Sequence, residues 1–148
     1  MMAVERSFTS LGSRLVDLEA AGKDRLEDAE HLRAAGRHAS AIVMGIYALE
    51  IALKARICRL LKMPQLPKAF EIHDLRGLLI VSGLVNAMAK RGSRSVKKNW
   101  ELITITAVDF ASLRYLPTSA KTRREADDFF FQLTDPKTGV FPWISRQT

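Results

Sequence analysis

One carboxylate lies in the most apolar stretch of the chain. Residues 41–53 are almost wholly apolar, yet they include Glu50, and Lys54 follows it at a spacing of four. An ionised carboxylate buried without a partner costs several kcal/mol, so Glu50 is expected to reach the surface or to meet a cation. Arg114, on a later helix, is the first expected partner. Lys54 is the second, as a surface pair, because i and i+4 lie on one helix face.

A histidine–aspartate pair, His73 and Asp74, offers a second chemistry. Imidazole changes charge near neutral pH, so His73 could act as a general acid or base that Asp74 or Glu50 orients. In the structural alternative, Asp74 caps the next helix and the pair fixes the loop after Pro67. The structural alternative is favoured, because aspartate is a common residue at the start of a helix.

Arg114 and Tyr115 end an apolar pattern further along the chain. Structurally, Arg114 would pair with Glu50 or Asp109, and Tyr115 would cover the core. Functionally, Arg114 would contact a phosphate group of a nucleotide or RNA. Both interpretations stay open, and no residue is predicted to be catalytic. The candidate ligand-binding residues are Arg114, Tyr115, Glu50, Lys54, His73 and Asp74.

Two clusters of basic residues are candidates for contact with nucleic acid. The first cluster comprises Lys90, Arg91, Arg94, Lys97 and Lys98, and the second comprises Lys121, Arg123 and Arg124. Cations of this kind neutralise phosphates, although most charge runs are solvated faces. The formal net charge of +7 permits an acidic partner and does not establish one. Trp100 could stack on a base, but its helical spacing favours the core.

The single cysteine, Cys58, lies in an apolar helical run and is expected to be a small core residue. One cysteine cannot form an internal disulfide framework. The sequence contains no CxxC or HExxH motif, so neither a metal nor a cofactor is predicted. The first residues lack a signal-peptide pattern, and the apolar run over residues 39–53 is too short to span a bilayer. We therefore expect a cytoplasmic protein without membrane contact.

These side chains would be positioned by helices, because apolar residues recur at spacings of three and four. The chain is expected to be all-α, an up-and-down bundle of four to five helices without a sheet. Residues 1–14 are expected to form a loose arm and residues 15–148 a single domain. A strand over the β-branched residues 103–108 is the weaker alternative. The helices are expected over about 15–35, 38–62, 75–81, 95–115 and 120–133, with the apolar residues 140–144 docking back on the bundle.

The ordered motifs resemble the HEPN family (higher eukaryotes and prokaryotes nucleotide-binding domain). The segments that carry the resemblance are "AAGRHASA", "ALEIALKA", "HDLRGLL", "SLRY" and "EADDFFFQL", over about residues 26–133. The resemblance implies a helical bundle that often dimerises. It also implies a link to RNA cleavage, nucleotide binding, or toxin–antitoxin and defence systems.

Many active members of that family are metal-independent ribonucleases with an Arg-x(4–6)-His motif on a late helix. Arg114 occupies the matching place, but no histidine follows it in "RYLPTSAKTRREADD". Arg25 with His31 and Arg33 with His38 match the spacing, but they lie on or beside the first helix and are expected to be polar surface residues. The ribonuclease motif is therefore absent where the resemblance would place it.

The resulting hypothesis is a non-catalytic HEPN-like binding module for a nucleotide, RNA or a protein partner. The alternative is a metal-independent endoribonuclease that uses His73, Glu50 and Arg114. A third hypothesis is a structural partner for a nucleotidyltransferase-like or antitoxin protein. A homodimer is expected from the resemblance, and from the apolar segments "GVFPWI" and "DDFFFQL", which offer more apolar surface than one small bundle needs.

Overall fold

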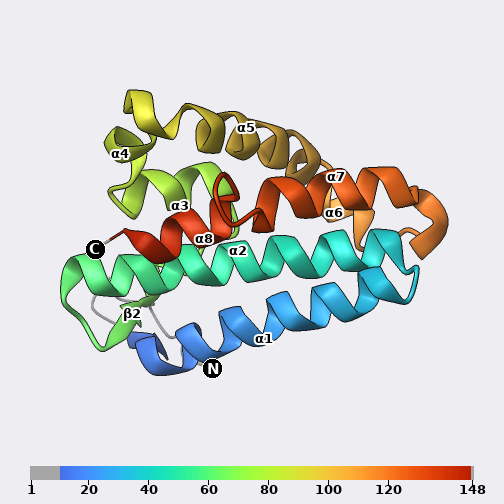
Figure 1. Ribbon diagram of the computed structural model, residues 1–148. Coiled ribbons are helices and arrows are strands. Elements are labelled where there is room, and N and C mark those ends of the chain that lie inside the picture. Colours follow the sequence, from blue (N-terminus) through green and yellow to red (C-terminus); the bar gives the residue numbers. More distant parts are fainter. Residues whose placement is uncertain (1–10, 148) are drawn as a thin grey trace, which may run out of the picture.

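A long antiparallel helical hairpin forms the base of the molecule. The computed structural model describes residues 11–147, and helices α1 (Leu15–Ala34) and α2 (His38–Leu61) form the hairpin (Figure 1). Gly36 turns the chain between them with a φ of 76°, a left-handed conformation that glycine adopts at little cost. The predicted bounds of both helices and the predicted stop at Gly36 are confirmed.

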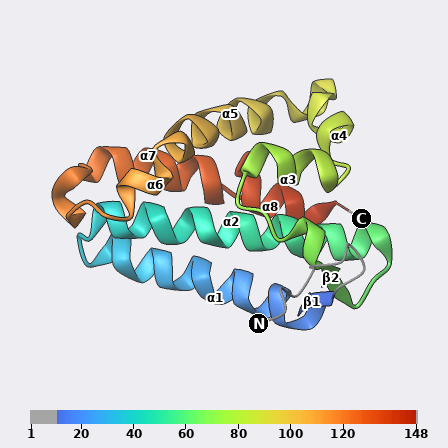
Figure 2. The ribbon, with the colours of Figure 1, turned by 180° about the vertical axis from the view of Figure 1, so that it is seen from behind.

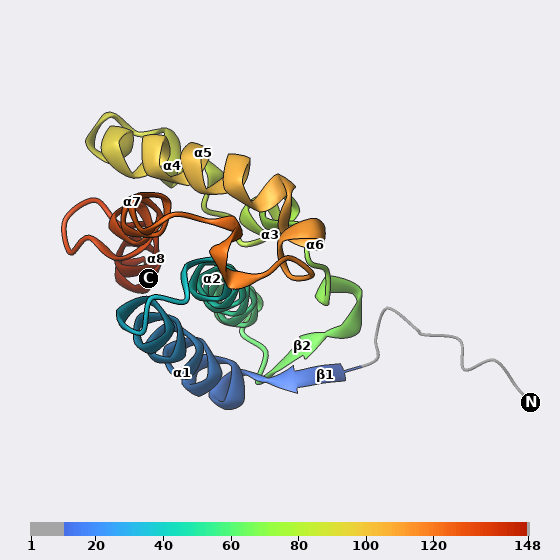
Figure 3. The same ribbon diagram turned by 90° about the vertical axis from the view of Figure 1, so that its right-hand side faces the viewer.

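Helix α2 is the central element of the fold. Viewed almost along its axis, it has α1 on one side and the later helices on the others (Figure 3). Twelve of its residues are buried, more than in any other described element, so the expectation that it is the most buried helix is confirmed. A helix that is apolar on nearly every face requires neighbours on several sides, and α2 has them.

Helices α3 (Leu75–Val81), α4 (Val85–Ala89), α5 (Arg94–Val108) and α6 (Phe110–Leu113) follow, and α5 forms the outer layer (Figure 3). Helix α4 was not predicted. The expected helix over residues 95–115 is divided at Asp109, whose carbonyl accepts the first bond of the next short helix from the Leu113 N–H. Thr104 and Thr106 also donate hydroxyl hydrogen bonds to carbonyls one turn back, a contact that weakens a helix.

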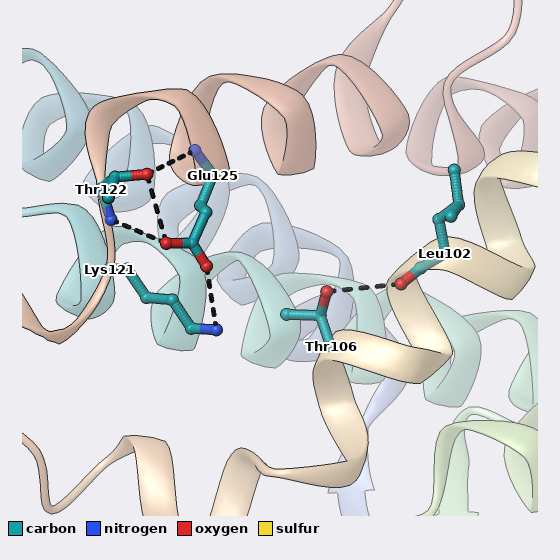
Figure 4. A network of polar contacts seen from close by, with 5 residues as sticks. All are labelled: Leu102, Thr106, Lys121, Thr122 and Glu125. Atoms are coloured by element: carbon teal, nitrogen blue, oxygen red, sulfur yellow. Dashed lines mark hydrogen bonds and ion pairs between the residues drawn. The ribbon is translucent and has the colours of Figure 1, made fainter.

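Helices α7 (Arg123–Thr134) and α8 (Val140–Arg146) complete the bundle. A capping box starts α7: the Thr122 hydroxyl accepts from the Glu125 N–H, and the Glu125 carboxylate accepts from the Thr122 N–H (Figure 4). The apolar tail docks back as expected, because Trp143 and Ile144 are buried. Three short 3₁₀ helices, η1 (Lys68–Phe70), η2 (Arg91–Ser93) and η3 (Thr118–Ala120), connect the longer elements.

The expectation that the chain has no sheet is wrong. Strand β1 (Leu11–Arg14) pairs antiparallel with β2 (Gln65–Pro67), close to the C-terminal end of α2 (Figure 2). Residues Leu11–Arg14 of the expected loose arm are therefore a paired strand, and the first ten residues of that arm lie outside the described part of the chain. The cause is tertiary: the loop after α2 returns to the start of α1, where Leu15 N–H donates to the Pro64 carbonyl at 2.8 Å.

The protein is mostly helical, as predicted. The described residues form eight α-helices where four to five were expected, and the additional helices are short. Over residues 11–147, no helix combines the length and hydropathy needed to cross a bilayer. The two apolar segments that suggested surplus surface for a dimer are largely used in the core of one chain: Phe129, Phe130 and Trp143 are buried, whereas Phe131 is exposed. The single-domain expectation and the likeness to HEPN proteins stay predictions.

Candidate functional site

Glu50 is buried in α2 and contacts two side chains, those of Lys54 and His73. Only 6% of its side chain is exposed. Its Oε1 atom accepts from Lys54 Nζ at 3.3 Å and contacts His73 Nδ1 at 2.5 Å. The lysine is one helical turn away, so the second expected partner is confirmed. The pair is more buried than expected, because only 12% of the Lys54 side chain is exposed.

The expected pair between Glu50 and Arg114 is wrong. Among the described residues, the carboxylate pairs with Lys54 and His73 alone. Arg114 is exposed, and its guanidinium lies 5.8 Å from the ring centre of Phe110 and 5.1 Å from that of Tyr115. Because α5 ends at Val108, Arg114 follows a separate short helix and does not extend toward Glu50. Tyr115 is also exposed, so it does not cover the core.

His73 lies over Glu50 because the next residue fixes the start of α3. The Asp74 side chain accepts hydrogen bonds from the backbone N–H groups of Arg76 at 3.3 Å and Gly77 at 3.1 Å. The predicted cap is therefore confirmed. Leu75 is buried and anchors the same turn in the core. Asp74 therefore caps α3 while His73, the residue before it, contacts Glu50.

The imidazole of His73 has one buried contact and one accessible side. Its side chain is 81% exposed, although Nδ1 lies against Glu50. Lys54 can only donate, so Glu50 Oε1 is an acceptor and His73 Nδ1 donates to it. In the neutral ring, Nε2 then carries the lone pair and can accept a proton or a hydrogen bond from a ligand.

A cleft of about 380 Å³ adjoins this pair. Apolar side chains of α2, α5 and α6 form much of its wall, and Glu50, His73, Asp74 and Arg76 supply the polar groups. Its lining residues are Ile46, Glu50, His73, Asp74, Leu75, Arg76, Thr104, Ala107, Val108 and Phe110. The structure thus brings together three of the predicted ligand-binding residues, Glu50, His73 and Asp74. Arg114 and Tyr115 are not among the lining residues.

A second cleft of about 390 Å³ adjoins the first between α3, α4 and α5. The two clefts share Arg76 and Thr104, and we call the pair of adjoining clefts the α3–α5 groove. Its second half is mainly apolar and includes Ile80, Met88 and Trp100. Sequence reasoning missed Arg76. The signal was available, since Arg76 follows the His73–Asp74 pair in "HDLR".

The first basic cluster surrounds the start of α5. Its five side chains are exposed, and none forms an ion pair with another described residue. Lys97 lines the α3–α5 groove. No acidic residue lies in the first turn of α5 to offset the positive end of the helix dipole. The groove therefore opens beside a positive surface, although the Glu101 carboxylate lines the same half of the groove.

The second basic cluster is partly neutralised. Lys121 lies 3.3 Å from Glu125, and Arg123 lies 3.8 Å from Asp127 (Figure 4 shows the first pair). Hydrogen bonds from the Thr122 N–H and from Lys121 hold the pKa of the Glu125 carboxyl below its ordinary value. Arg124 forms no ion pair with a described residue. This cluster is the weaker candidate for binding an anion.

The two Arg–His pairs with the ribonuclease spacing are held by local contacts. Arg25 pairs with Asp28 at 3.0 Å, and Arg33 pairs with Glu30 at 2.9 Å. Arg33 also stacks on Phe130, at 4.8 Å from the ring centre. Arg33 and His38 do line one cleft of about 520 Å³, at the turn between α1 and α2. Its acidic side chains already pair with the arginines there.

Cys58 is fully buried, and burial raises the pKa of its thiol. The expectation of a small core residue is therefore confirmed. Within residues 11–147, no group of three or more histidine, cysteine, aspartate or glutamate side chains is arranged to hold a metal ion. Trp100 is buried, as its helical spacing predicts, although an edge of it lines the α3–α5 groove.

Comparison with known proteins adds no relative: no family model, no curated protein and no solved structure matches the chain significantly.

Proposed function

We propose that the protein is a HEPN-like binding module that holds a nucleotide or a single-stranded segment of RNA in the α3–α5 groove. The observation that carries the proposal is the position of Arg76, which lines both halves of the groove. A guanidinium there is placed to contact a phosphate group. The apolar half beside it suits a base, and the polar half offers Glu50 and His73 to a sugar hydroxyl.

The charge around the groove supports a ligand of this kind. Lys97 lines the groove, and the rest of the first basic cluster surrounds its apolar end. Cations along a groove bind the phosphate backbone and make the affinity depend on salt. The formal net charge of +7 acts in the same direction. A toxin–antitoxin or defence role belongs to the same proposal and rests on the family resemblance alone.

Fluorescence anisotropy with a labelled single-stranded RNA tests this function. Binding is expected to weaken as salt rises, and Arg76→Gln is expected to weaken it by about tenfold, the effect of roughly 1.4 kcal/mol. Lys68→Gln is the matched control, because it removes the same charge from an exposed residue outside the groove. Equal losses in the two variants would show that net charge, and not the groove, binds the RNA.

RNA cleavage without a metal is the second candidate function, and the contact between His73 and Glu50 favours it. His73 Nε2 would take the proton of a ribose 2′-OH while Glu50 holds the ring. The 2′ oxygen would then form a bond to phosphorus as the bond from phosphorus to the 5′ oxygen breaks, and the departing 5′ oxygen would take a proton from water. We nevertheless expect no robust cleavage, because no histidine follows Arg114 at the family spacing. Cleavage in EDTA that is lost in His73→Ala would establish the second candidate.

The partner proposals concern the adjoining outer face of α5, which shares Val108 with the α3–α5 groove. A homodimer remains our proposal, now on the outer face of α5, where Leu102, Ile105 and Val108 are exposed at a spacing of three. A nucleotidyltransferase-like or antitoxin protein is the alternative partner for the same apolar face. Co-purification of the chain with proteins encoded beside it would separate these two partners.

A further inference from the structure

A groove of about 620 Å³ lies between α1, α2 and α8, and it shares no lining residue with the α3–α5 groove. Helices α1 and α8 border the same side of α2 (Figure 3). The floor consists of small or apolar residues, and the volume is within the range of small-molecule sites. The residues of this floor are Leu18, Gly22, Ala52, Ala55, Phe141 and Ile144.

Arg56 is the unusual residue of this groove. It is half-buried, and its Nη1 atom donates to the Gln147 carbonyl at 3.2 Å. Its Nε atom is inaccessible and has no hydrogen-bond partner. No described carboxylate lies within ion-pair distance of the guanidinium. A cation withdrawn from water without an anion is unfavourable, so an anion beside Arg56 would relieve a cost that the chain already bears.

The neighbouring arginine provides an internal comparison. Arg59 lies one turn further along α2, and Glu19 of α1 neutralises it at 2.6 Å. Lys23, also on α1, lines the groove and forms no ion pair with a described residue. The groove therefore presents two cations, Arg56 and Lys23, that form no ion pair with any residue of the described range 11–147, above an apolar floor.

We infer that this groove binds a small amphipathic carboxylate, with its apolar chain on the floor and its head group on Arg56. The planar guanidinium matches a carboxylate in a two-point contact, whereas an apolar floor offers nothing to a polar body such as a sugar. Lys23 adds attraction from the opposite wall. This site is independent of the α3–α5 groove and of any RNA that the groove binds.

Titration of the ¹⁵N-labelled full chain with decanoate tests the inference, with decanol as the uncharged ligand of equal chain length. We expect saturable amide shifts at Gly22 and Ile144 with decanoate, and binding of decanol weaker by about tenfold. Equal affinities for the two ligands would overturn the inference, because the head group would then contribute nothing. Amide shifts confined to other helices, or the absence of saturable shifts, would also overturn it.

Three variants connect the affinity to the proposed contact. Arg56→Gln is expected to reduce decanoate affinity by about tenfold while decanol affinity stays unchanged, and Arg56→Lys is expected to restore part of it. Lys23→Gln, at an exposed residue whose loss does not threaten folding, is expected to give a smaller reduction. Lys68→Gln removes the same charge outside the groove and should leave decanoate binding unchanged. Equal effects of Lys23→Gln and Lys68→Gln, with Arg56→Gln unchanged, would refute the assignment.

Discussion

Glu50 joins α2 to the loop before α3 through a single oxygen atom. That oxygen contacts a lysine of the same helix and a histidine that lies 23 residues further along the chain. The two partners differ greatly in exposure: the Lys54 side chain is largely withdrawn from water, and that of His73 is not. Loss of the buried contact with Lys54 is therefore expected to affect stability, whereas His73 is exposed enough to contact a ligand.

Replacement of Glu50 by alanine is expected to destabilise the protein by about 2 kcal/mol. The figure lies between the roughly 0.5 kcal/mol of a surface pair and the 3–5 kcal/mol lost when a fully buried pair is broken. The reason is that Lys54, with 12% of its side chain exposed, would lose its carboxylate and remain mostly buried. Urea unfolding of the variant and the wild type measures the difference.

Double-mutant cycles identify the partner. Glu50→Ala and Lys54→Ala are expected to couple by about 1 kcal/mol, because the two residues are in contact. Glu50→Ala and Arg114→Ala are expected to be additive, since Arg114 lies on aromatic rings. Coupling between Glu50 and Arg114 would contradict the structure described here.

The contacts of Glu50 show which part of the site the sequence could predict. The contact with Lys54 follows from helix geometry alone, so a spacing of four was enough to propose it. The contact with His73 depends on how the loop after α2 folds. The sequence suggested it only as one of two options, in which either Asp74 or Glu50 orients the imidazole. The expected contact with Arg114 failed because the helix is interrupted at Asp109, and Arg114 follows a separate short helix with its guanidinium against Phe110 and Tyr115.

At the scale of elements, side chains of α7 pack directly against α2 at Gly45. A Cβ atom at this position would lie 2.6 Å from Phe129 Cε1 and 3.2 Å from Leu133 Cδ2. Both side chains are buried and cannot move away freely. Gly45→Ala is therefore expected to lower the free energy of unfolding by about 1–3 kcal/mol, although alanine is the better helix former. Chemical denaturation gives this value.

Gly92 provides the matched control for that substitution. A Cβ atom at Gly92 would meet no atom within 4 Å. Gly92→Ala should therefore change stability by less than about 0.5 kcal/mol. If both alanine variants were equally stable, close packing of α2 on α7 would not explain the glycine at position 45.

The capping box at the start of α7 is expected to make stability depend on pH. Backbone and lysine contacts lower the pKa of Glu125 in the folded protein. A lowered pKa means that the stabilisation is complete above the unfolded-state pKa and is lost as pH falls through the folded-state value, in the range below roughly pH 4. Glu125→Gln should thus lower the Tm at pH 7 and have a smaller effect at pH 3.

Thr122→Ala separates the hydroxyl cap from the carboxylate charge. It removes the hydroxyl that accepts from the Glu125 N–H at 3.1 Å, and the expected loss is about 1 kcal/mol at neutral pH. Asp128→Asn, at an exposed residue of the same helix outside the box, is the control and should leave the Tm nearly unchanged. A Glu125→Gln effect that grew toward low pH would contradict the proposed sign.

The elements found from the sequence are those whose signals are local. Helices α1 and α2 have long periodic patterns and a glycine between them, so their bounds were predicted closely. Strand β2 is three residues long and holds Pro67, a composition that argues against a strand. Its pairing with β1 exists only because the fold brings the two segments together. Helix α4 spans five residues, fewer than periodicity can identify.

At the scale of the whole molecule, apolar surface and positive charge both meet at α5. Ile105 and Val108 are 64% and 74% exposed, whereas the basic cluster surrounds the other end of the helix. We expect the chain to be a dimer at micromolar concentration, with the apolar face of α5 at the interface. Light scattering is expected to give twice the chain mass, and Ile105→Glu is expected to give the mass of one chain.

Ala20→Glu is the control for that experiment. It adds the same charge at an exposed position of α1, away from α5, and should leave the dimer intact. Circular dichroism should show that both variants keep their helix content. A single-chain mass for the wild type would remove α5 as an interface between copies.

The position of Cys58 has a consequence for how the protein can be studied. It is the only cysteine of the sequence, it is fully buried in α2, and burial keeps its thiol protonated. A thiol-specific reagent reacts with the exposed thiolate, so labelling requires an opening event that uncovers α2. Because α2 lies at the centre of the bundle, such an event amounts to separation of its neighbours (Figure 3). The rate of labelling therefore measures, on the unaltered chain, how often the elements packed around Cys58 open.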